Sequence, residues 1–374
     1  MANQISILRD DLIKALQLIV NLSERKQLAP ILALVLVQIN GQRITFTASD
    51  SEIEISSYID SLTPWTKEPC SFTMPGKKIL DLCRTFLEGS MVTLSEENGV
   101  LHLSNQESNF NFPILAAADF PLINAEQPPF QSQIEEKEFK RLLDKTSFNV
   151  PFQDIRHYLT GLLLDFSEQY VQAVATDGHR LAAARARLTQ VVKESRQLIV
   201  PRRTIMELVR MLDSEESGLL TISCNYQYIR IASSRFQLTS KLIDGHFPNW
   251  KRIIPKKGEV VINIDTEKLS RSVQRINLLI NEVFRSVSLT FANSWLQLDS
   301  NNPGQEAKDR VPIAYQDEPI TVLLNIEYLR DLLKVVSAPE IAIYLKREIG
   351  GIVIEEKGAT EGNLFVIMPI KQAE

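Results

Sequence analysis

The chain repeats one order of secondary structure three times, and this repeat limits the possible fold more than any other feature of the sequence. Equivalent landmarks recur at a nearly constant spacing: Leu12, Phe139 and Leu269 (127 and 130 residues apart), Pro75, Pro201 and Asn325 (126 and 124 apart), and Asp50, Asp177 and Asn302 (127 and 125 apart). Three ordered landmarks at one period are difficult to obtain by chance. We therefore expect three copies of one domain, at residues 1–125, 130–254 and 258–374.

Each copy opens with a short extended segment and an amphipathic helix, and near its middle a strand runs into a second helix. The predicted helices are residues 8–20, 75–87, 137–146, 201–212, 266–277 and 325–336. Alternation of apolar and polar residues predicts further strands at 34–39, 43–47, 92–103, 110–115, 161–166, 171–175, 220–231, 236–242, 287–291, 295–298, 341–354 and 364–368. Pro75 and Pro201 suit a first helical turn, and Asn325 suits an N-cap. The predicted unit is α+β, with two helices and about eight short, mostly antiparallel strands.

The length of 374 residues is too great for a single hydrophobic core. The longest apolar stretch, Ala29 to Val37, is too short for a membrane helix, and the first twenty residues lack the apolar centre of a signal peptide. The three cysteines are widely spaced, which fits a reducing compartment and excludes a disulfide framework. We therefore expect a cytoplasmic protein.

The net charge of −5 argues against nucleic-acid binding if it is taken alone. The charge is unevenly distributed, however: the predicted helices contain 17 Lys and Arg against 9 Asp and Glu, so they carry +8 and the rest of the chain −13. Such segregation lets an acidic protein present a positive surface to phosphates. Lys and Arg are also good helix formers, so the bias alone does not decide the matter. Together with the repeat it favours DNA binding, and the lack of an Arg- or Asn-rich recognition helix favours binding that is independent of sequence.

The sequence carries no recognisable catalytic or metal-binding motif. Asp177 and His179 are the one pair that resembles an acid and a base, but Asp177-Gly178 between two apolar strands first predicts a tight hairpin turn. The equivalent run in the first copy, Ser49 to Glu52, has no histidine. We therefore expect no catalysis, no cofactor and no metal, and we expect His179 and Arg180 on this turn to bind a partner.

Three segments, Thr176-Asp-Gly-His-Arg-Leu181, Phe247-Pro-Asn-Trp250 and Val366-Ile-Met-Pro-Ile-Lys371, resemble the bacterial DNA polymerase III beta subunits, the sliding clamp family. The resemblance extends over essentially the whole chain and accounts for its threefold repeat. It implies three clamp domains in each chain and a head-to-tail homodimer that closes into a ring, with helices at the pore and sheets outside. The implied function is to encircle double-stranded DNA and to tether the replicative polymerase and other replication and repair proteins, which confers processivity. The resemblance also implies a clamp loader that uses ATP, and no membrane.

The resemblance further implies that partners insert a short peptide into a hydrophobic pocket between the second and third copies. Carried over position by position, the pocket comprises Leu159, Thr176, Gly178, His179, Arg180, Leu181, Pro248, Arg252, Ile253, Asn325, Tyr328, Ile349, Val366, Met368, Pro369 and Ile370. Aliphatic side chains would form its walls, while Arg180, His179 and Arg252 would orient the peptide at the rim. For Leu181, Val366 and Met368, plain core packing is an alternative role.

DNA contacts and a ring interface follow from the same resemblance. The matched DNA positions are Arg25, Lys26, Gln153, His157, Tyr158, Arg202 and Arg203. Candidates for the pore lining, each of which could also be an ordinary solvated residue, are Lys77, Lys78, Lys140, Arg141, Lys268, Arg271 and Arg275. Ring closure would join Lys78 and Phe110 of the first copy to Leu278, Leu279 and Glu306 of the third.

The sequence departs from the family pattern at this interface. Family members carry an acidic run after Asn301-Asn-Pro303, where this chain has Gly304-Gln-Glu-Ala-Lys-Asp-Arg310. On the opposite side, the basic residues expected just before Phe110 are Glu107 and Asn109. We interpret the change as a partly reversed electrostatic match, a hypothesis under which this chain forms poor heterodimers with an unrelated clamp.

Two other functions remain open from the residues alone. The chain could be a monomeric or open repeat scaffold that binds peptides but not DNA, or a hydrolase that uses Asp177 and His179. Size in solution separates a clamp from a scaffold, because a clamp has twice the 42.4 kDa of one chain. An activity screen of His179→Ala addresses the hydrolase.

Overall fold

The computed structural model describes residues 4–23, 29–65, 69–123, 128–212, 218–280, 285–302, 305–346, 350–358 and 362–370. The chain forms two compact units. The N-terminal unit comprises Met1–Glu135 and Glu216–Leu242, and the C-terminal unit comprises Glu136–Glu215 and Ile243–Glu374. The division between them therefore falls inside the second predicted copy and not between copies.

The strands and helices follow the predicted order in all three copies. The first copy contains β1 (Gln4–Leu8), α1 (Arg9–Ser23), β2 (Val35–Asn40), β3 (Arg43–Ser49), β4 (Ile53–Asp60), β5 (Cys70–Met74), α2 (Gly76–Arg84), β6 (Met91–Glu97), β7 (Val100–Ser104) and β8 (Asn109–Pro113). The second contains β9 (Phe130–Glu135), α3 (Glu136–Thr146), β10 (Gly161–Ser167), β11 (Tyr170–Thr176), β12 (Arg180–Arg187), β13 (Arg196–Pro201), α4 (Arg202–Met211), β14 (Leu219–Cys224), β15 (Tyr228–Ala232), β16 (Phe236–Lys241) and the short α5 (Trp250–Ile253). The third contains β17 (Val260–Asp265), α6 (Thr266–Asn277), β18 (Ser286–Ala292), β19 (Trp295–Asn302), β20 (Gln305–Pro312), β21 (Ile320–Asn325), α7 (Ile326–Val335), β22 (Glu340–Leu345), β23 (Ile352–Glu356) and β24 (Leu364–Ile367).

Within the described ranges each copy has eight strands and two helices of at least nine residues, which confirms the predicted α+β unit. The six predicted helices agree with the observed ones to within three residues at each end. The predicted C-terminal end of α2, at residue 87, was too late, since the helix ends at Arg84. The hydroxyl of Thr85 donates to the carbonyl of Leu82 at 2.7 Å and closes the last turn. The sequence did not predict α5, and it gave no separate range for β4, β12 or β20.

The helix caps follow the sequence closely. Asn325 caps α7 as predicted, because its side chain accepts a hydrogen bond from the N–H of Glu327 at 3.0 Å. Pro75 and Pro201 lie at the N-cap positions of α2 and α4, one residue before the first turn in which they were expected.

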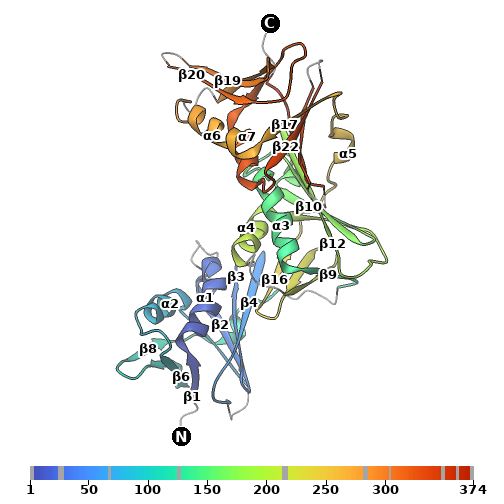
Figure 1. Cartoon of the computed structure of the whole chain (residues 1–374). Helices are drawn as coiled ribbons and strands as arrows, with labels where there is room; N and C mark the ends of the chain where they lie inside the picture. The colour runs from blue at the N-terminus through green and yellow to red at the C-terminus, as the bar shows by residue number, and fades with distance from the viewer. Residues whose placement is uncertain are drawn as a thin grey trace. The chain divides into compact units, whose positions relative to one another are not determined.

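Two eight-stranded antiparallel sheets each combine strands of two consecutive copies (Figure 1). The order is β5-β2-β3-β4-β16-β15-β14-β9 in the N-terminal unit and β13-β10-β11-β12-β24-β23-β22-β17 in the C-terminal unit. The two remaining sheets have four strands each, in the orders β1-β6-β7-β8 and β20-β19-β18-β21. Because the middle copy gives half of its strands to each large sheet, the two compact units divide that copy.

The two large sheets are joined in the same register. Glu54 of β4 lies opposite Thr239 of β16, and Leu181 of β12 lies opposite Val366 of β24. Glu54 and Leu181 occupy equivalent places, since each lies four residues beyond the aspartate of its hairpin turn, Asp50 or Asp177. The repeat in sequence is therefore also a repeat in strand pairing.

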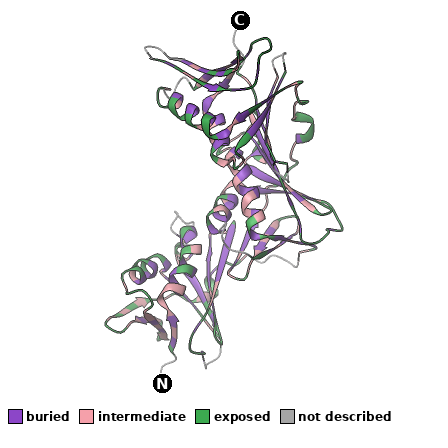
Figure 2. Ribbon diagram, in the orientation of Figure 1, coloured by how far each residue is buried: buried purple, intermediate pink, exposed green. Residues whose placement is uncertain are grey.

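The core of each unit lies between helices and sheets, and the buried residues follow the inner faces of both (Figure 2). In α6 the buried apolar residues are Leu269, Val273 and Ile276, at the three- and four-residue spacing of an amphipathic helix. They belong to one cluster with Phe291 of β18 and Phe365 of β24. None of the helices in the described parts of the chain is long and apolar enough to span a bilayer.

A buried ion pair connects α3 of the second copy to β23 of the third. Nζ of Lys145 lies 2.7 Å from Oε1 of Glu356, with side-chain exposures of 5% and 3%. Lys145 also donates to the carbonyl of Val335 and the hydroxyl of Ser337, and Asn363 donates to Glu356. Burial alone would raise the pKa of Glu356, but these hydrogen bonds and the charge of Lys145 outweigh it and lower the pKa.

Replacing Glu356 by glutamine should lower the free energy of unfolding of the C-terminal unit by about 3–5 kcal/mol, because Lys145 would be left as a buried unpaired charge. The wild-type contribution is present above the pKa of an unfolded glutamate and is lost as the pH falls through the lowered folded pKa, so the difference between the two proteins should shrink in acid. Urea unfolding at several pH values measures both effects.

Glu340→Gln provides the matched control. Glu340 pairs with Lys357 at 2.9 Å, but both side chains are about half exposed, at 49% and 52%. Its loss should cost less than about 1 kcal/mol. Equal effects of the two substitutions would show that burial does not set the importance of the Lys145 pair.

Candidate partner-binding site

The turn between β11 and β12 is held by its own side chains. One carboxylate oxygen of Asp177 accepts hydrogen bonds from the N–H groups of His179 and Arg180, both at 2.9 Å. The hydroxyl of Thr176 donates to the carbonyl of Arg180 and accepts from the N–H of Gly178. Gly178 has a φ of +89°, a conformation that favours glycine. Asp177 thus forms the predicted turn with one carboxylate oxygen, and its other oxygen accepts a hydrogen bond from Nε of Arg180 at 3.0 Å.

The first copy has the same turn. Oδ1 of Asp50 accepts hydrogen bonds from the N–H groups of Glu52 and Ile53, at 3.0 and 2.8 Å. The turn is therefore part of the repeated fold, and the residues that distinguish the second copy are His179 and Arg180.

Arg180 anchors this turn to the third copy. Its guanidinium forms ion pairs with Asp177 at 3.0 Å and Asp331 at 3.1 Å, and it donates to the carbonyl of Phe148 at 3.1 Å. The same group stacks 4.6 Å from the centre of the Tyr328 ring, and the side chain is only 15% exposed. Nε, Nη1 and Nη2 of Arg180 each donate within the fold, so little of this side chain is exposed, and its expected role in orienting a peptide stays a prediction.

The neighbours of Arg180 are electrostatically adapted to it. Burial alone would raise the pKa of Asp331, but hydrogen bonds from Arg180 and Lys334 outweigh it and lower the pKa. Burial raises the pKa of Tyr328, and the negative charge of Asp177 raises it further. Tyr328 therefore remains a neutral phenol beside the cation.

An apolar floor lies next to the turn, where β12 pairs with β24. Leu181 and Val366 lie opposite each other and are 2% and 3% exposed. They form one buried cluster with Trp250, and Phe247 and Ile254 pack against it. For these two residues the alternative of core packing is confirmed.

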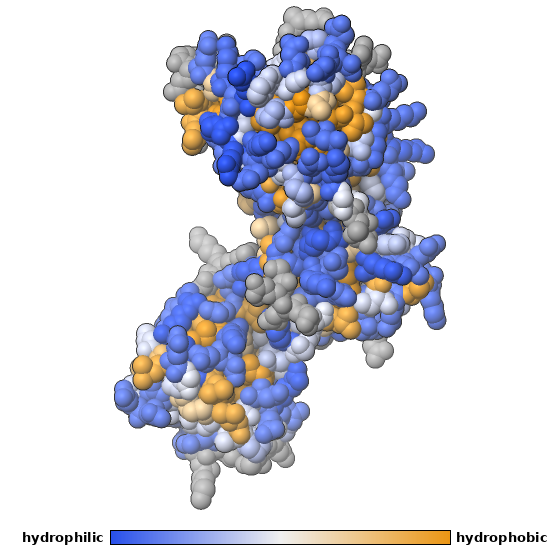
Figure 3. Space-filling model, in the orientation of Figure 1, coloured by the Kyte–Doolittle hydropathy of each residue, from blue (hydrophilic) through white to orange (hydrophobic). Residues whose placement is uncertain are grey.

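Exposed apolar side chains border this floor. The N–H of Met368 donates to the carbonyl of His179 at 2.8 Å, which brings the chain end after β24 to the turn. Met368 is 41% exposed, Ile370 41% and Ile253 50%. Figure 3 shows orange, hydrophobic patches among the hydrophilic residues on one face of the C-terminal unit. Met368 therefore stays available to a partner, unlike Leu181 and Val366.

Sequence reasoning missed two neighbours of these residues. A Cβ on Gly351 would lie 2.7 Å from the Pro255 ring and 2.9 Å from the sulfur of Met368, so only glycine leaves room there. Arg156 donates to the carbonyl of Asp177 at 3.1 Å, and its guanidinium lies 3.1 Å from where a Cβ on Gly178 would be. No periodicity marks either residue, because their importance depends on contacts between distant segments.

The other expected pocket residues have varied positions. Leu159 and Thr176 are buried, Pro248, Asn325, Tyr328 and Pro369 are half-buried, and Gly178, His179 and Arg252 are exposed. Ile349 lies outside the described residues. The structure thus brings Thr176–Leu181, Tyr328, Val366 and Met368 together by direct contacts.

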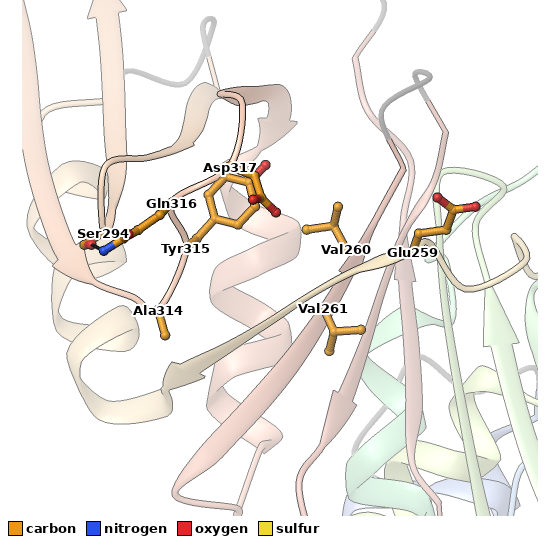
Figure 4. A pocket seen from close by; sticks show the side chains of 8 residues that line it. All are labelled: Glu259, Val260, Val261, Ser294, Ala314, Tyr315, Gln316 and Asp317. Carbon is orange, nitrogen blue, oxygen red and sulfur yellow. Dashed lines mark hydrogen bonds between the residues drawn. The ribbon is translucent and has the colours of Figure 1, made fainter.

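Two surface grooves lie in the C-terminal unit. One, of 290 Å³, is lined by Leu163, Asp165, Gln197, Phe247, Pro248, Asn249, Trp250 and Lys251, and so reaches the apolar floor from the Pro248 side. The other, of 640 Å³, lies beside the edge strand β17, with Val260 and Val261 on one side and Ala314 to Asp317 on the other (Figure 4). The second groove contains none of the expected pocket residues.

The candidate DNA contacts divide by exposure. On α6, Lys268, Arg271 and Arg275 are 61%, 66% and 58% exposed, and on α2 Lys77 is 46% exposed. On α3, Lys140 is only 16% exposed and pairs with Asp144, while Arg141 is 26% exposed and pairs with Glu138. The expected charges on α6 and α2 therefore reach solvent, whereas those on α3 are largely held in local contacts.

The remaining expected DNA contacts lie mainly on the loop before β10 and at the start of α4. Nε2 of His157 donates to the carbonyl of Asp244 at 3.0 Å, and Nε of Arg202 donates to the carbonyl of Val150 at 3.2 Å. Gln153 and His157 are exposed, while Tyr158, Arg202 and Arg203 are half-buried. Arg25 and Lys26 lie outside the described residues.

The residues expected at a ring interface are exposed or half-buried in the single chain. Leu278 and Leu279, just after α6, are 84% and 44% exposed. Lys78 on α2 and Glu306 on β20 are exposed. The half-buried ring of Phe110, on β8, lies 6.1 Å from that of Phe86.

Replacing Arg180 by alanine should lower the free energy of unfolding of the C-terminal unit by about 2–3 kcal/mol, because Asp177 and Asp331 would lose a shared, nearly buried donor. The pKa of Asp331 should rise. Arg252→Ala is the matched control, since Arg252 is exposed and should contribute within about 0.5 kcal/mol. Urea unfolding compares the two, and equal stability would contradict the anchoring role of Arg180.

Comparisons with known proteins agree along the entire chain. Models of the DNA polymerase III beta subunit match with its N-terminal domain at residues 3–124, its central domain at 133–249 and its C-terminal domain at 251–371. The beta sliding clamp of Pseudomonas putida is 32% identical over 367 residues, which cover 98% of this chain and 99% of the relative. That of Escherichia coli is 30% identical over 364 residues, 97% of this chain and 98% of the relative.

Solved structures show the same fold. The DNA polymerase III subunit beta from Pseudomonas aeruginosa superposes with a TM-score of 0.92 and 30% identity, over 99% of this chain and all of that one. A sliding clamp from the same organism bound to griselimycin gives a TM-score of 0.94 and 31% identity over the whole of both chains. With three clamp domains in the order of the family and this closeness of sequence and fold, the chain belongs to the family of DNA polymerase III beta subunits, the beta sliding clamps.

Proposed function

We propose that this protein is a processivity clamp: two copies pair head to tail into a ring that encircles double-stranded DNA and tethers the replicative polymerase and other partners to it. The observation that carries the proposal is that two strands, β8 and β20, have a neighbour on one side only. Where one copy follows another, β4 pairs with β16 and β12 pairs with β24. In the third copy, β20 is the equivalent of β4 and β12. In the first copy, β8 is the equivalent of β16 and β24. Both β20 and β8 lie at the edges of their sheets.

These two edges differ from the other edges of the sheets. The strands β1, β9 and β17 are edges in all three copies, as are β5, β13 and β21. Among the strands that the structure describes, only β8 and β20 lack a neighbour that their counterparts have. Pairing β20 of one molecule with β8 of another would complete both sheets, and doing so twice would close a ring with no such edge left.

Apolar contacts favour the same pairing. At the joined boundary Phe148, just after α3, lies 6.3 Å from Phe365 of β24. The residue 130 positions beyond Phe148 is Leu278, and the counterpart of Phe365 on β8 is Phe110. Leu278 is 84% exposed in the single chain, so a second copy that covers it with Phe110 would remove a large apolar side chain from water.

Lys78, Leu279 and Glu306 complete the proposed interface. Lys78 corresponds by the repeat to Tyr328, which contacts Arg180 across the joined boundary. Glu306 corresponds to Glu54 and Leu181, the residues that lie opposite β16 and β24. We therefore assign these residues to ring closure.

DNA would be held by enclosure and by phosphate contacts. The exposed cations of α6 and α2 sit on an otherwise acidic chain of net charge −5. Contacts of this kind are salt-sensitive and independent of sequence, as sliding requires. We place Arg25, Lys26, Gln153, His157, Tyr158, Arg202 and Arg203 among the DNA contacts, with the pore candidates of α2, α3 and α6.

Partners would bind at the turn of β11 and β12 with a short peptide, against Met368, Ile253 and the apolar floor. The polymerase and the clamp loader would compete for this site. The structure of a relative with griselimycin supports a ligand site on this fold. The relatives are named as clamps and not as enzymes, and we propose that this protein likewise has no chemistry of its own, uses no cofactor and acts in the cytoplasm.

Engineered disulfides test the ring. With the register of the joined boundaries, Glu306 would lie opposite Asn111 of the partner subunit. Residues directly opposite in antiparallel strands have Cβ atoms ~4.5–5.5 Å apart, which is close to disulfide geometry. Glu306→Cys combined with Asn111→Cys should therefore give a covalent dimer on mild oxidation, measured by non-reducing electrophoresis.

The matched control moves one cysteine by two residues, to Asn109, where the Cβ separation rises to ~7–8 Å and cross-linking should fall sharply. The single variants show whether native thiols interfere; burial raises the pKa of Cys83 to about 12, and Cys224 is buried too. A monomer in solution with no cross-link would favour the open peptide-binding scaffold.

Retention on DNA tests enclosure. After a clamp loader places the protein on nicked circular DNA, it should remain there in moderate salt and leave within minutes when the circle is cut, because a ring can slide off a free end. Gel filtration of the labelled protein with circular and with linearised DNA measures this. Equal retention on both forms would show that the protein adheres to DNA and does not enclose it.

A further inference from the structure

Two residues of opposite charge, Arg310 on the edge strand β20 and Glu107 next to the edge strand β8, have no ion-pair partner among the described residues. Arg310 on β20 lies over the ring of Trp295, 4.4 Å from its centre, and has no ion pair there. Its neighbour Asp309 faces the other side of the strand, where it pairs with Arg275 at 2.6 Å. Glu107, in the turn between β7 and β8, is exposed. Both charges are therefore free to meet something outside the single chain.

The turn that carries Glu107 has a counterpart before β16. In the first, the side chain of Asn105 accepts hydrogen bonds from the N–H groups of Glu107 and Ser108. In the second, the hydroxyl of Ser233 accepts them from Arg235 and Phe236. Glu107 therefore occupies the position of Arg235.

Arg310 has its own counterpart on β4. Arg310 lies opposite Gln297, as Tyr58 lies opposite Thr45 in the equivalent hairpin. Tyr58 is stacked by Arg43 at 4.6 Å, and Arg310 stacks on Trp295 at 4.4 Å, with the same spacing between the partners along the chain. The cation and the aromatic ring have exchanged places, but the pair of positions is the same.

These two positions touch at the boundary that the single chain already contains. The N–H of Tyr58 donates to the carbonyl of Arg235 at 3.0 Å. The geometry therefore points to a contact between Arg310 of one molecule and Glu107 of the next when β20 pairs with β8.

We propose that Arg310 forms an ion pair with Glu107 of the partner subunit at both closures of the ring, and that this pair makes the ring selective for copies of this chain. The inference rests on the proposed ring. Lys308, two residues along β20, would lie opposite Asn109 of the partner subunit, an uncharged residue, so the discriminating charge is concentrated at Arg310. A clamp with an acidic residue at the position of Arg310 would meet Glu107 with like charge, which disfavours mixed rings.

Charge reversal in trans tests the pair. Arg310→Glu alone puts two carboxylates together at both closures, and Glu107→Arg alone puts two guanidinium groups together. Each variant alone should have a monomer–dimer Kd at least about tenfold higher than wild type in low salt. In an equimolar mixture of the two variants both closures regain opposite charges, so the mixture should form a heterodimer with a Kd within about threefold of wild type.

Analytical ultracentrifugation with one variant fluorescently labelled measures these constants at low and high salt, and the differences should shrink as salt is added. Lys308→Glu is the matched control on the same face of the same strand, and it should weaken dimers less than Arg310→Glu. Rescue in the mixture separates a charge effect from damage to the fold, because damage in one variant would not be repaired by the other.

The outcomes separate the pair from the ring. Wild-type dimers together with unchanged dimers of both single variants would overturn the ion pair and leave the clamp intact. Weakened variants that fail to associate with each other would overturn the proposed register of Arg310 and Glu107. A wild-type protein that remains monomeric at concentrations of tens of micromolar would overturn the proposed function itself.

Discussion

Every β-sheet has to end its ladder of backbone hydrogen bonds somewhere, and in this protein the position of those ends governs the architecture. In two of the three copies the sheet continues into the next copy, because β4 pairs with β16 and β12 pairs with β24. The equivalent pairing is not made at β20 and β8, which are the edges of their sheets in the single chain. A repeat that ends in two complementary edges must either protect them or pair them. The exposed Leu278 near one edge and the half-buried Phe110 on the other favour pairing.

The partner site shows how a fold can use charged residues for structure and leave others for binding. Arg180 and Lys145 both connect the second copy to the third, and both have their donors occupied there. The groups that we propose for partner binding are different ones: exposed apolar side chains such as Met368, and the exposed His179. The turn itself is rigid, because Asp177 and Thr176 satisfy its backbone groups. A partner would therefore meet a surface that is already formed, which lowers the entropic cost of binding.

We propose two separate roles for charge in this molecule. Among the described residues, the cations of α6 pair with neighbours one turn away or with Asp309, and they remain largely exposed, so they can still attract phosphates at long range. On β20 the charges alternate in sign along the strand, with Glu306 beside Lys308 and Asp309 beside Arg310, which suits recognition of one partner in one register. An acidic chain can thus have a basic DNA surface and a polar interface without conflict, because the groups lie on different elements.

The sequence by itself determined the threefold repeat, the α+β unit, the order of strands and helices, the Asp177 turn and the cap at Asn325. These features depend on residues close together in the chain, where periodicity and turn chemistry act directly. It did not predict β4, β12 and β20. The first two strands join one copy to the next, and β20 is a sheet edge. Apolar and polar residues alternate only weakly in these strands, which include Ser56-Ser57 and Ala182-Ala183-Ala184.

Tertiary structure alone decided the roles of Arg180, Lys145 and Gly351. Arg180 pairs with Asp331, which lies 151 residues further along the chain, and Lys145 pairs with Glu356, which lies 211 residues further along. A motif can mark such residues as notable but cannot say whether their charge will face water or another segment. That distinction arises only when distant strands pair and exclude solvent, because burial and hydrogen bonding, and not residue type, set what a charged side chain can do.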